Sequence, residues 1–228
     1  TLPADDVSTV NCITDATEPV PPVVTDFCGN NIIPTGPVRS ADPACEGDIT
    51  YIWTYTDCAG NSNDWTYTYT IDIPDFTLPA DDASTVNCIA DATEPVPPVV
   101  TDFCGNSIVP TGPVRSADPA CEGDITYTWT YTDCAGNSHD WTYTYTIDIP
   151  DFTMPADDAS TVNCIADAIE PVPTVVTDFC GNNIIPTGPV RSADPACEGD
   201  ITYTWTYTDC AGNSHDWTYT YTIDIPDS

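Results

Sequence analysis

The chain has 228 residues, of which 36 are Asp or Glu and only three are Lys or Arg, so its formal net charge is −33. With so few cations it cannot neutralise a phosphate backbone, which excludes nucleic-acid binding. No stretch approaches the ~20 apolar residues of a membrane-spanning helix, so membrane insertion is not expected either. Hydrophobic residues still make up 41% of the chain, which favours a folded protein over a disordered one.

An internal repeat of 76 residues organises the whole chain. Each block carries twelve Asp or Glu, four Cys, four Tyr, two Trp and one Arg. The first block opens with TLPADDVSTVNC, the second with TLPADDASTVNC and the third with TMPADDASTVNC. Such near-identity indicates a recently duplicated array, and a block of this length suits one small domain. The sequence therefore predicts three tandem domains at residues 1–76, 77–152 and 153–228.

The first half of each block predicts short strands. In the first block, residues 7–13 and 20–27 have the composition of strands, and residues 31–34 and 36–41 are shorter candidates. Prolines at positions 19, 21 and 22 confine the start of the second strand to a sheet edge or an irregular entry.

The second half of each block predicts a long β-hairpin. Residues 49–56 and 65–73 alternate large apolar and small polar side chains on either side of a turn at residues 58–62. Alternation with period two is typical of half-buried antiparallel strands, here with one aromatic face and one threonine face. Nothing has a helical period. Six or seven short strands in 76 residues predict an all-β fold, with three tandem immunoglobulin-like β-sandwich domains in a rod.

The cysteines indicate disulfides. Cys12, Cys28, Cys45 and Cys58 contain no Cys-x-x-Cys pair, so the spacing of a zinc ribbon is absent. An even number of cysteines in a small, acidic, Lys-free domain predicts two structural disulfides per block and an oxidising, extracellular compartment.

Strand length narrows the pairing within a block. Cys45 and Cys58 bracket a strand of about nine residues, roughly 30 Å long, which is far beyond the ~7 Å Cα limit for a disulfide. In a sandwich of this type, the loop after the second strand lies beside the final hairpin turn. We therefore expect Cys28–Cys58 at one pole of each domain and Cys12–Cys45 at the other, with the equivalent pairs in the later blocks. Each bond would close a loop worth about 3–4 kcal/mol.

Acidic and amide side chains cluster where one block meets the next. Up to eight oxygen-bearing side chains could converge at each junction, which is the number and kind of ligand that Ca²⁺ takes. The predicted interdomain calcium ligands are Asp72, Asp75, Asp81, Asp82, Asp102, Asn106, Asp133, Asn137, Asp148, Asp151, Asp157, Asp158, Asp178, Asn182, Asp209 and Asn213. The alternative is a solvated acidic surface without metal. The linker, residues 73–79, contains two prolines and should be semi-rigid.

The end of each block resembles a known family. The run Thr-Asp-Cys-Ala-Gly-Asn-Ser at residues 56–62, followed by an alternating Trp-Thr-Tyr strand, resembles the end of hyalin-repeat (HYR-like) domains. The four-cysteine version is similar to the tandem repeats of giant Bacteroidota cell-surface adhesins, including gliding-motility adhesins exported by type IX secretion. The resemblance implies immunoglobulin-like modules in a stalk or adhesive fibre, and it implies no catalytic residues.

The residues themselves also argue against an enzyme. His139 and His215 occupy a turn position that is Asn63 in the first block, so no histidine-based catalytic set repeats. Arg39, Arg115 and Arg191 are each the only cation of their block and are expected to pair with a nearby Asp rather than bind an anionic ligand.

The predicted function is therefore structural: an extracellular, disulfide-stapled stalk or filament of a bacterial surface adhesin, whose partners are neighbouring repeats in a longer chain. The alternative is direct binding of a glycan, a surface or ice through the loops or the threonine face, whose regular hydroxyls could order water. A third hypothesis is self-association into fibres. The sequence does not identify a ligand at the tip.

Overall fold

The computed structural model describes residues 1–226. By backbone proximity the chain divides into two compact units. Unit 1 comprises Thr1–Asp81, Val96–Pro113 and Thr128–Trp141, and unit 2 comprises Asp82–Pro95, Val114–Tyr127 and Thr142–Ser228. Each unit contains one junction between consecutive repeats, and each is described by itself. The domain boundaries predicted from the repeat stay a prediction.

Each repeat contains six strands and one 3₁₀ turn in the same order. The first repeat has β1 (Asp6–Val10), η1 (Ile13–Asp15), β2 (Val24–Thr25), β3 (Asn31–Ile32), β4 (Thr35–Arg39), β5 (Gly47–Thr56) and β6 (Ser62–Ile71). The second has β7 (Asp82–Val86), η2 (Ile89–Asp91), β8 (Val100–Thr101), β9 (Ser107–Ile108), β10 (Thr111–Arg115), β11 (Gly123–Thr132) and β12 (Ser138–Ile147). The third has β13 (Asp158–Val162), η3 (Ile165–Asp167), β14 (Val176–Thr177), β15 (Asn183–Ile184), β16 (Thr187–Arg191), β17 (Gly199–Thr208) and β18 (Ser214–Ile223).

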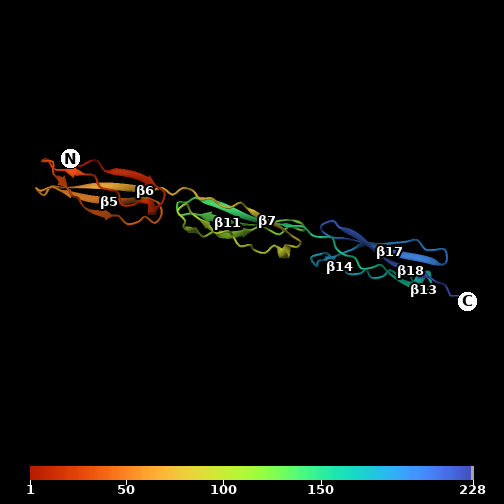
Figure 1. Ribbon diagram of the computed structural model, residues 1–228. Coiled ribbons are helices and arrows are strands. Elements are labelled where there is room, and N and C mark those ends of the chain that lie inside the picture. Colours follow the sequence, from red (N-terminus) through yellow and green to blue (C-terminus); the bar gives the residue numbers. More distant parts are fainter. Residues whose placement is uncertain (227–228) are drawn as a thin grey trace. The chain divides into compact units, whose positions relative to one another are not determined.

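A four-stranded sheet is the main layer of each repeat. In the first repeat its strand order is β1-β6-β5-β4, and β5 and β6 are the long antiparallel hairpin (Figure 1). β4 pairs with β5 antiparallel, whereas β1 pairs with β6 in parallel. A small ribbon of β2 and β3 forms a separate sheet. The all-β class and the three sandwich-like units are as predicted; the parallel edge strand was not anticipated.

The hairpin places its aromatic face in the core, as its alternation predicts. Ile49, Tyr51, Trp53 and Tyr55 of β5 are all buried. Trp53 stands directly opposite Trp65 of β6, and the two ring centroids are 5.3 Å apart. Such facing aromatic side chains bury a large apolar area and supply most of the cohesion of a small domain.

An irregular segment covers this aromatic face. The Tyr51 hydroxyl donates a hydrogen bond to the Ala16 carbonyl at 2.8 Å, and the Tyr55 hydroxyl donates to the Pro22 carbonyl at 2.6 Å. The predicted strand at residues 20–27 is reduced to the two residues of β2, because the prolines before it cannot donate ladder hydrogen bonds. The tyrosine hydroxyls instead satisfy backbone carbonyls of this covering segment.

The edge strand β4 carries the only basic side chain of its repeat. Arg39 forms an ion pair with Asp42 at 2.5 Å, donates to the Tyr51 hydroxyl at 3.0 Å and lies 5.7 Å from the centre of that ring. Arg115 and Arg191 form the same contacts with Asp118 and Asp194. The expected pairing of each arginine with a nearby aspartate is confirmed.

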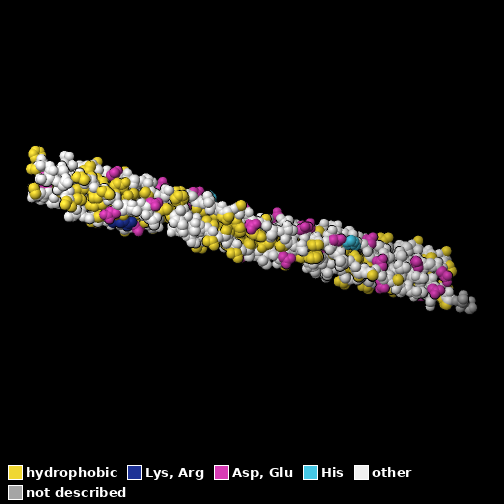
Figure 2. All heavy atoms as spheres, viewed as in Figure 1, with side chains coloured by type: hydrophobic (Ala, Val, Ile, Leu, Met, Phe, Trp, Pro, Cys, Tyr) yellow, Lys and Arg dark blue, Asp and Glu magenta, His cyan; other side chains and the backbone are white. Residues whose placement is uncertain are grey.

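The surface is acidic throughout. On the face shown in Figure 2, Asp and Glu side chains are dispersed over the surface, and basic side chains are sparse and lie against acidic ones. Within the described residues there is no helix with the length and apolar character needed to cross a membrane.

Candidate functional site

Two turns in each repeat share one hydrogen-bonded design. In the first turn, the Asp26 carboxylate accepts the backbone N–H groups of Cys28 and Asn30 at 2.8 and 2.9 Å and the Asn30 side-chain amide at 3.0 Å. In the second, Asp57 accepts the N–H groups of Ala59 and Asn61 and the Asn61 amide in the same way. Each turn holds one exposed cysteine, Cys28 or Cys58.

These two turns lie at the same pole of the repeat. A surface cavity of 200 Å³ is lined by residues of both, including Asp26, Phe27, Asp57 and Asn61. Cys45 precedes β5 and Cys58 follows it, so Cys45 belongs to the opposite pole. The placement of the cysteine-bearing loops at two poles agrees with the expectation from sequence.

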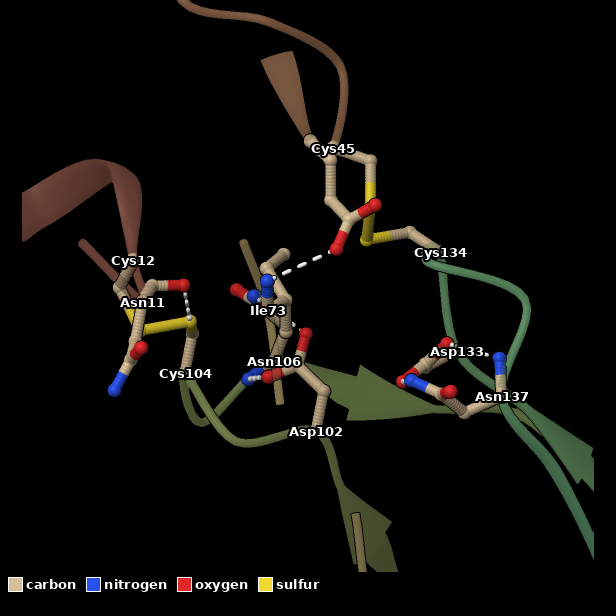
Figure 3. Close-up of a disulfide and its surroundings, with 11 residues drawn as sticks. Asn11, Cys12, Cys45, Ile73, Asp102, Cys104, Asn106, Asp133, Cys134 and Asn137 are labelled. Carbon is tan, nitrogen blue, oxygen red and sulfur yellow. Dashed lines mark hydrogen bonds between the residues drawn. A yellow bond between two sulfur atoms is a disulfide. The ribbon is translucent and has the colours of Figure 1, made fainter. Parts of the chain in front are cut away.

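The pairing of the cysteines, however, was predicted wrongly. Cys12 of the first repeat is bonded to Cys104 of the second, and Cys45 is bonded to Cys134, each with a Cα–Cα distance of 5.7 Å (Figure 3). The next junction repeats the pattern with Cys88–Cys180 and Cys121–Cys210. The predicted Cys12–Cys45 and Cys28–Cys58 bonds and their equivalents are not formed.

The physical reason is that each pole meets a neighbour. The pole of the first repeat that carries Cys12 and Cys45 faces the pole of the second that carries Cys104 and Cys134, and all four cysteines line one cavity of 150 Å³. Strand length excludes a bond between cysteines at opposite poles of one repeat, but it gives no information on cysteines of the next repeat. We call each such set of four cysteines, with the residues around it, a joint.

Apolar and polar burial both support the first joint. Ile73, at the start of the linker, is only 7% exposed, and its N–H donates to the Glu46 carboxylate at 2.9 Å. The turn aspartates Asp102 and Asp133 of the second repeat are 7% and 8% exposed. Each keeps its hydrogen bonds to the asparagine of its own turn, so burial leaves neither carboxylate without a partner.

The linker is also held by a histidine that sequence reasoning treated as surface decoration. His139 Nε2 lies 2.9 Å from both oxygens of Asp75, and its ring contacts the buried Phe76 edge-on with centroids 5.0 Å apart. His215 makes the same contacts with Asp151 and Phe152. The only available signal was that both histidines replace an asparagine at the same turn position.

The predicted calcium ligands do not gather into a cation site. The turn residues Asp102, Asn106, Asp133, Asn137, Asp178, Asn182, Asp209 and Asn213 hydrogen-bond within their own turns. Asp75 and Asp151 contact histidine, and Asp82, Asp157 and Asp158 each accept a backbone N–H. Asp72 and Asp148 donate their own N–H groups to valine carbonyls. Asp81 precedes β7.

A donor set spent in this way does not fit a calcium ion well, because Ca²⁺ needs six to eight oxygens directed at one point. Across residues 1–226, no three His, Cys, Asp or Glu side chains form a group that could hold a metal ion. Calcium binding therefore stays a prediction, and the joints have covalent and apolar connections that do not depend on it.

The threonine face is the second candidate surface. It comprises Thr50, Thr54, Thr56, Thr66, Thr68 and Thr70 of the hairpin. Several hydroxyls are occupied: Thr54 donates to Asp64 at 2.6 Å, Thr70 donates to Asp48 at 2.9 Å, and Thr56 bonds with Ser62. Cross-strand bonds of this kind stabilise the sheet and leave fewer regular hydroxyls to order water or bind a ligand.

Acid is expected to loosen the two turns of the first repeat. Hydrogen bonds from the Asn30 and Asn61 side chains, followed by backbone N–H groups, lower the pKa of Asp26 and of Asp57 below the usual 3.8. Because the folded pKa is depressed, these carboxylates contribute stability that is fully present above the unfolded pKa and is lost as the pH falls through the folded value.

Thermal unfolding measured from pH 7 to pH 2 tests this expectation. An Asp26→Asn/Asp57→Asn variant is the control, because it lacks these two titrating groups while the other carboxylates remain. The wild type should lose more stability than the variant below about pH 4. Identical pH profiles for the two proteins would contradict the prediction.

Comparison with known proteins identifies the repeat. A family model described as a HYR-like domain with 4 cysteines matches residues 1–71, 76–147 and 152–223. No curated protein matches the sequence significantly.

Solved structures with related topology are extracellular cadherin domains, at low similarity. Protocadherin gamma B7 domains 1–4 match with 10% identity and a TM-score of 0.31, over 86% of this chain and 66% of that one. Mouse protocadherin gamma C3 domains 1–3 match with 10% identity and a TM-score of 0.28, over 80% and 77%. Drosophila N-cadherin domains 1–4 match with 12% identity and a TM-score of 0.27, over 79% and 58%. Similarities at this level carry no argument about function.

Proposed function

Because the chain belongs to the family of HYR-like domains with four cysteines, we propose that it is an extracellular structural protein, the stalk or filament portion of a bacterial surface adhesin. The observation that supports this most directly is the covalent connection of consecutive repeats by paired disulfides. Disulfides of this kind persist in oxidising compartments outside the cytosol. The assignment to a Bacteroidota adhesin rests on the sequence resemblance alone.

The mechanism is mechanical. Each joint has three covalent connections, the linker and two disulfides, where an ordinary tandem array has one. Three separate attachment points resist both bending and twisting, because one repeat cannot rotate without stretching a bond. A pulling force therefore passes from repeat to repeat through several covalent paths, as a stalk requires.

The acidic surface suits such a role. A net charge of −33 spread over all three repeats keeps the protein solvated and opposes lateral packing of like-charged chains. The proposal is not an enzymatic one, since both histidines are engaged with linker residues and the first repeat has none. Direct binding through the threonine face is the weaker alternative, because several of its hydroxyls bond across the hairpin.

Small-angle X-ray scattering on oxidised and reduced protein tests the proposal. The oxidised protein is expected to behave as a stiff rod of about 120 Å, at roughly 40 Å per domain. Selective reduction of the joints should shorten and broaden its distance distribution, while tryptophan fluorescence reports whether the repeats stay folded. A compact oxidised particle would contradict a stalk. Calcium and EGTA arms test the calcium prediction separately: a change of length with chelator supports it.

A further inference from the structure

Four cysteines are unpaired among the described residues, and they occur as two pairs. Cys28 and Cys58 are exposed in the two turns of the first repeat. Cys164 and Cys197 are exposed in the third repeat, at the positions that correspond to Cys12 and Cys45. Neither pair is bonded internally.

Each pair is the counterpart of cysteines that are bonded elsewhere in the chain. Cys164 is equivalent to Cys12 and Cys88, which bond the first-turn cysteine of the following repeat. Cys197 is equivalent to Cys45 and Cys121, which bond the second-turn cysteine. The third repeat therefore presents one half of a joint, and the first repeat presents the other half.

The apolar surfaces around the two pairs are also those that a joint covers. Ile225 is 44% exposed, whereas its counterparts Ile73 and Ile149 within the joints are each 7% exposed. Phe27, beside Cys28, is fully exposed, whereas Phe103 and Phe179 in the joints are 55% and 53% exposed. The first repeat's turn aspartates are likewise less buried than those inside the joints.

We propose that two copies of this chain join end to end through a joint of the same kind, in which Cys164 and Cys197 of one copy bond Cys28 and Cys58 of the next. Two disulfides would take the place of the peptide linker that connects repeats within a chain. Because every copy has both half-joints, the reaction can continue into a covalent polymer. This inference deepens the structural role proposed above and depends on its oxidising environment.

The chemistry needs a two-electron oxidant for each bond, and a small-molecule disulfide such as oxidised glutathione supplies it. The Cys164 thiolate attacks oxidised glutathione, forms a mixed disulfide and releases one glutathione thiolate. The Cys28 thiolate of the second copy then attacks the Cys164 sulfur and releases the second glutathione. Each new protein disulfide thus consumes two protein thiols and yields two glutathione molecules. Cys197 and Cys58 react in the same way.

The main opposing force is charge repulsion between acidic copies. It is long-ranged at low salt and strongly screened at physiological ionic strength, where the Debye length is about 8 Å. The turn carboxylates add little to it at the contact, because they remain hydrogen-bonded within their own turns when buried. Polymer growth is therefore expected to be faster at higher salt.

The experiment oxidises the purified 228-residue protein in a glutathione redox buffer at 0.3 M NaCl. A non-reducing denaturing gel should show a ladder with steps of 24.5 kDa, which collapses to monomer on reduction. Peptide mass spectrometry should identify Cys164–Cys28 and Cys197–Cys58 linkages between copies, distinguished by mixing isotopically light and heavy protein.

Two matched variants control for random oxidation. Cys28→Ser/Cys58→Ser keeps only the half-joint of the third repeat, and Cys164→Ser/Cys197→Ser keeps only that of the first. All four positions are exposed and unpaired, so both variants should fold. Each alone should stay monomeric, and an equimolar mixture should give dimer and no longer species. Dimers of a single variant, a cyclised monomer, or internal Cys28–Cys58 and Cys164–Cys197 bonds would overturn the proposal. None of these outcomes would bear on the joints within the chain.

Discussion

Cutting the linker between the first two repeats is expected to leave them attached until a reductant is added. A protease site inserted after the exposed Thr77 allows the cut. Because Cys12–Cys104 and Cys45–Cys134 connect the repeats independently of the linker, the cut protein should run as one species on a non-reducing denaturing gel. With reductant it should separate into two fragments, one about half the length of the other.

The control is a Cys12→Ser/Cys45→Ser variant with the same inserted site, which should separate after cutting even without reductant. If the cysteines instead paired within each repeat, the cut parent protein would also separate without reductant. That result would refute the joint as described and the structural role proposed from it.

The same bonds should contribute much of the unfolding free energy. The chain-entropy model assigns about 4–5 kcal/mol to a disulfide that closes a loop of roughly 90 residues, and the bonded cysteines are 92 and 89 residues apart. The second bond of a joint contributes less, because the first has already shortened its loop. The urea midpoint of the Cys12→Ser/Cys45→Ser variant should therefore be well below that of the intact protein.

Replacing a core tryptophan is expected to have the largest effect of any single substitution within a repeat. Trp53 is 3% exposed and packs between Trp65 and Tyr51, with centroid distances of 5.3 and 6.1 Å. Trp53→Ala removes this contact area and leaves a cavity, at a cost of about 3–5 kcal/mol. Because a small domain has only ~5–15 kcal/mol of stability in total, the first repeat should unfold separately from the others.

Urea unfolding followed by tryptophan fluorescence would show this as an additional transition at low denaturant. Thr68→Ala, on the opposite face of the same hairpin, is the matched control and should cost at most about 1 kcal/mol. Equal effects of the two substitutions would mean that the aromatic face is not the core of the repeat.

The hairpin could be predicted from sequence because its information is local. Side chains alternate between the two faces of a strand, so the order of residues from Ile49 to Thr56 already assigns each to the core or to the outside. The covering layer could not be predicted in this way. Its prolines prevent a regular ladder, and its backbone carbonyls are satisfied by Tyr51 and Tyr55, which lie 35 and 33 residues away in the sequence.

The parallel pairing of β1 with β6 was missed for a similar reason. The first strand lies about 60 residues before its partner, and its composition is compatible with either direction. Likewise, nothing in the sequence showed that Asp75 and Phe76 of the linker would contact His139, since that contact exists only after two repeats meet.

The repeat, the all-β class, the aromatic core and the presence of structural disulfides were determined by the sequence alone, because each follows from composition, period or spacing within 76 residues. The partners of the cysteines were decided only by the tertiary structure. A disulfide requires two Cα atoms within a few ångströms, here 5.7 Å, and that distance depends on how consecutive repeats meet. Near-identical repeats carry the same four cysteines, so their sequences are equally compatible with bonds inside a repeat and bonds across a joint.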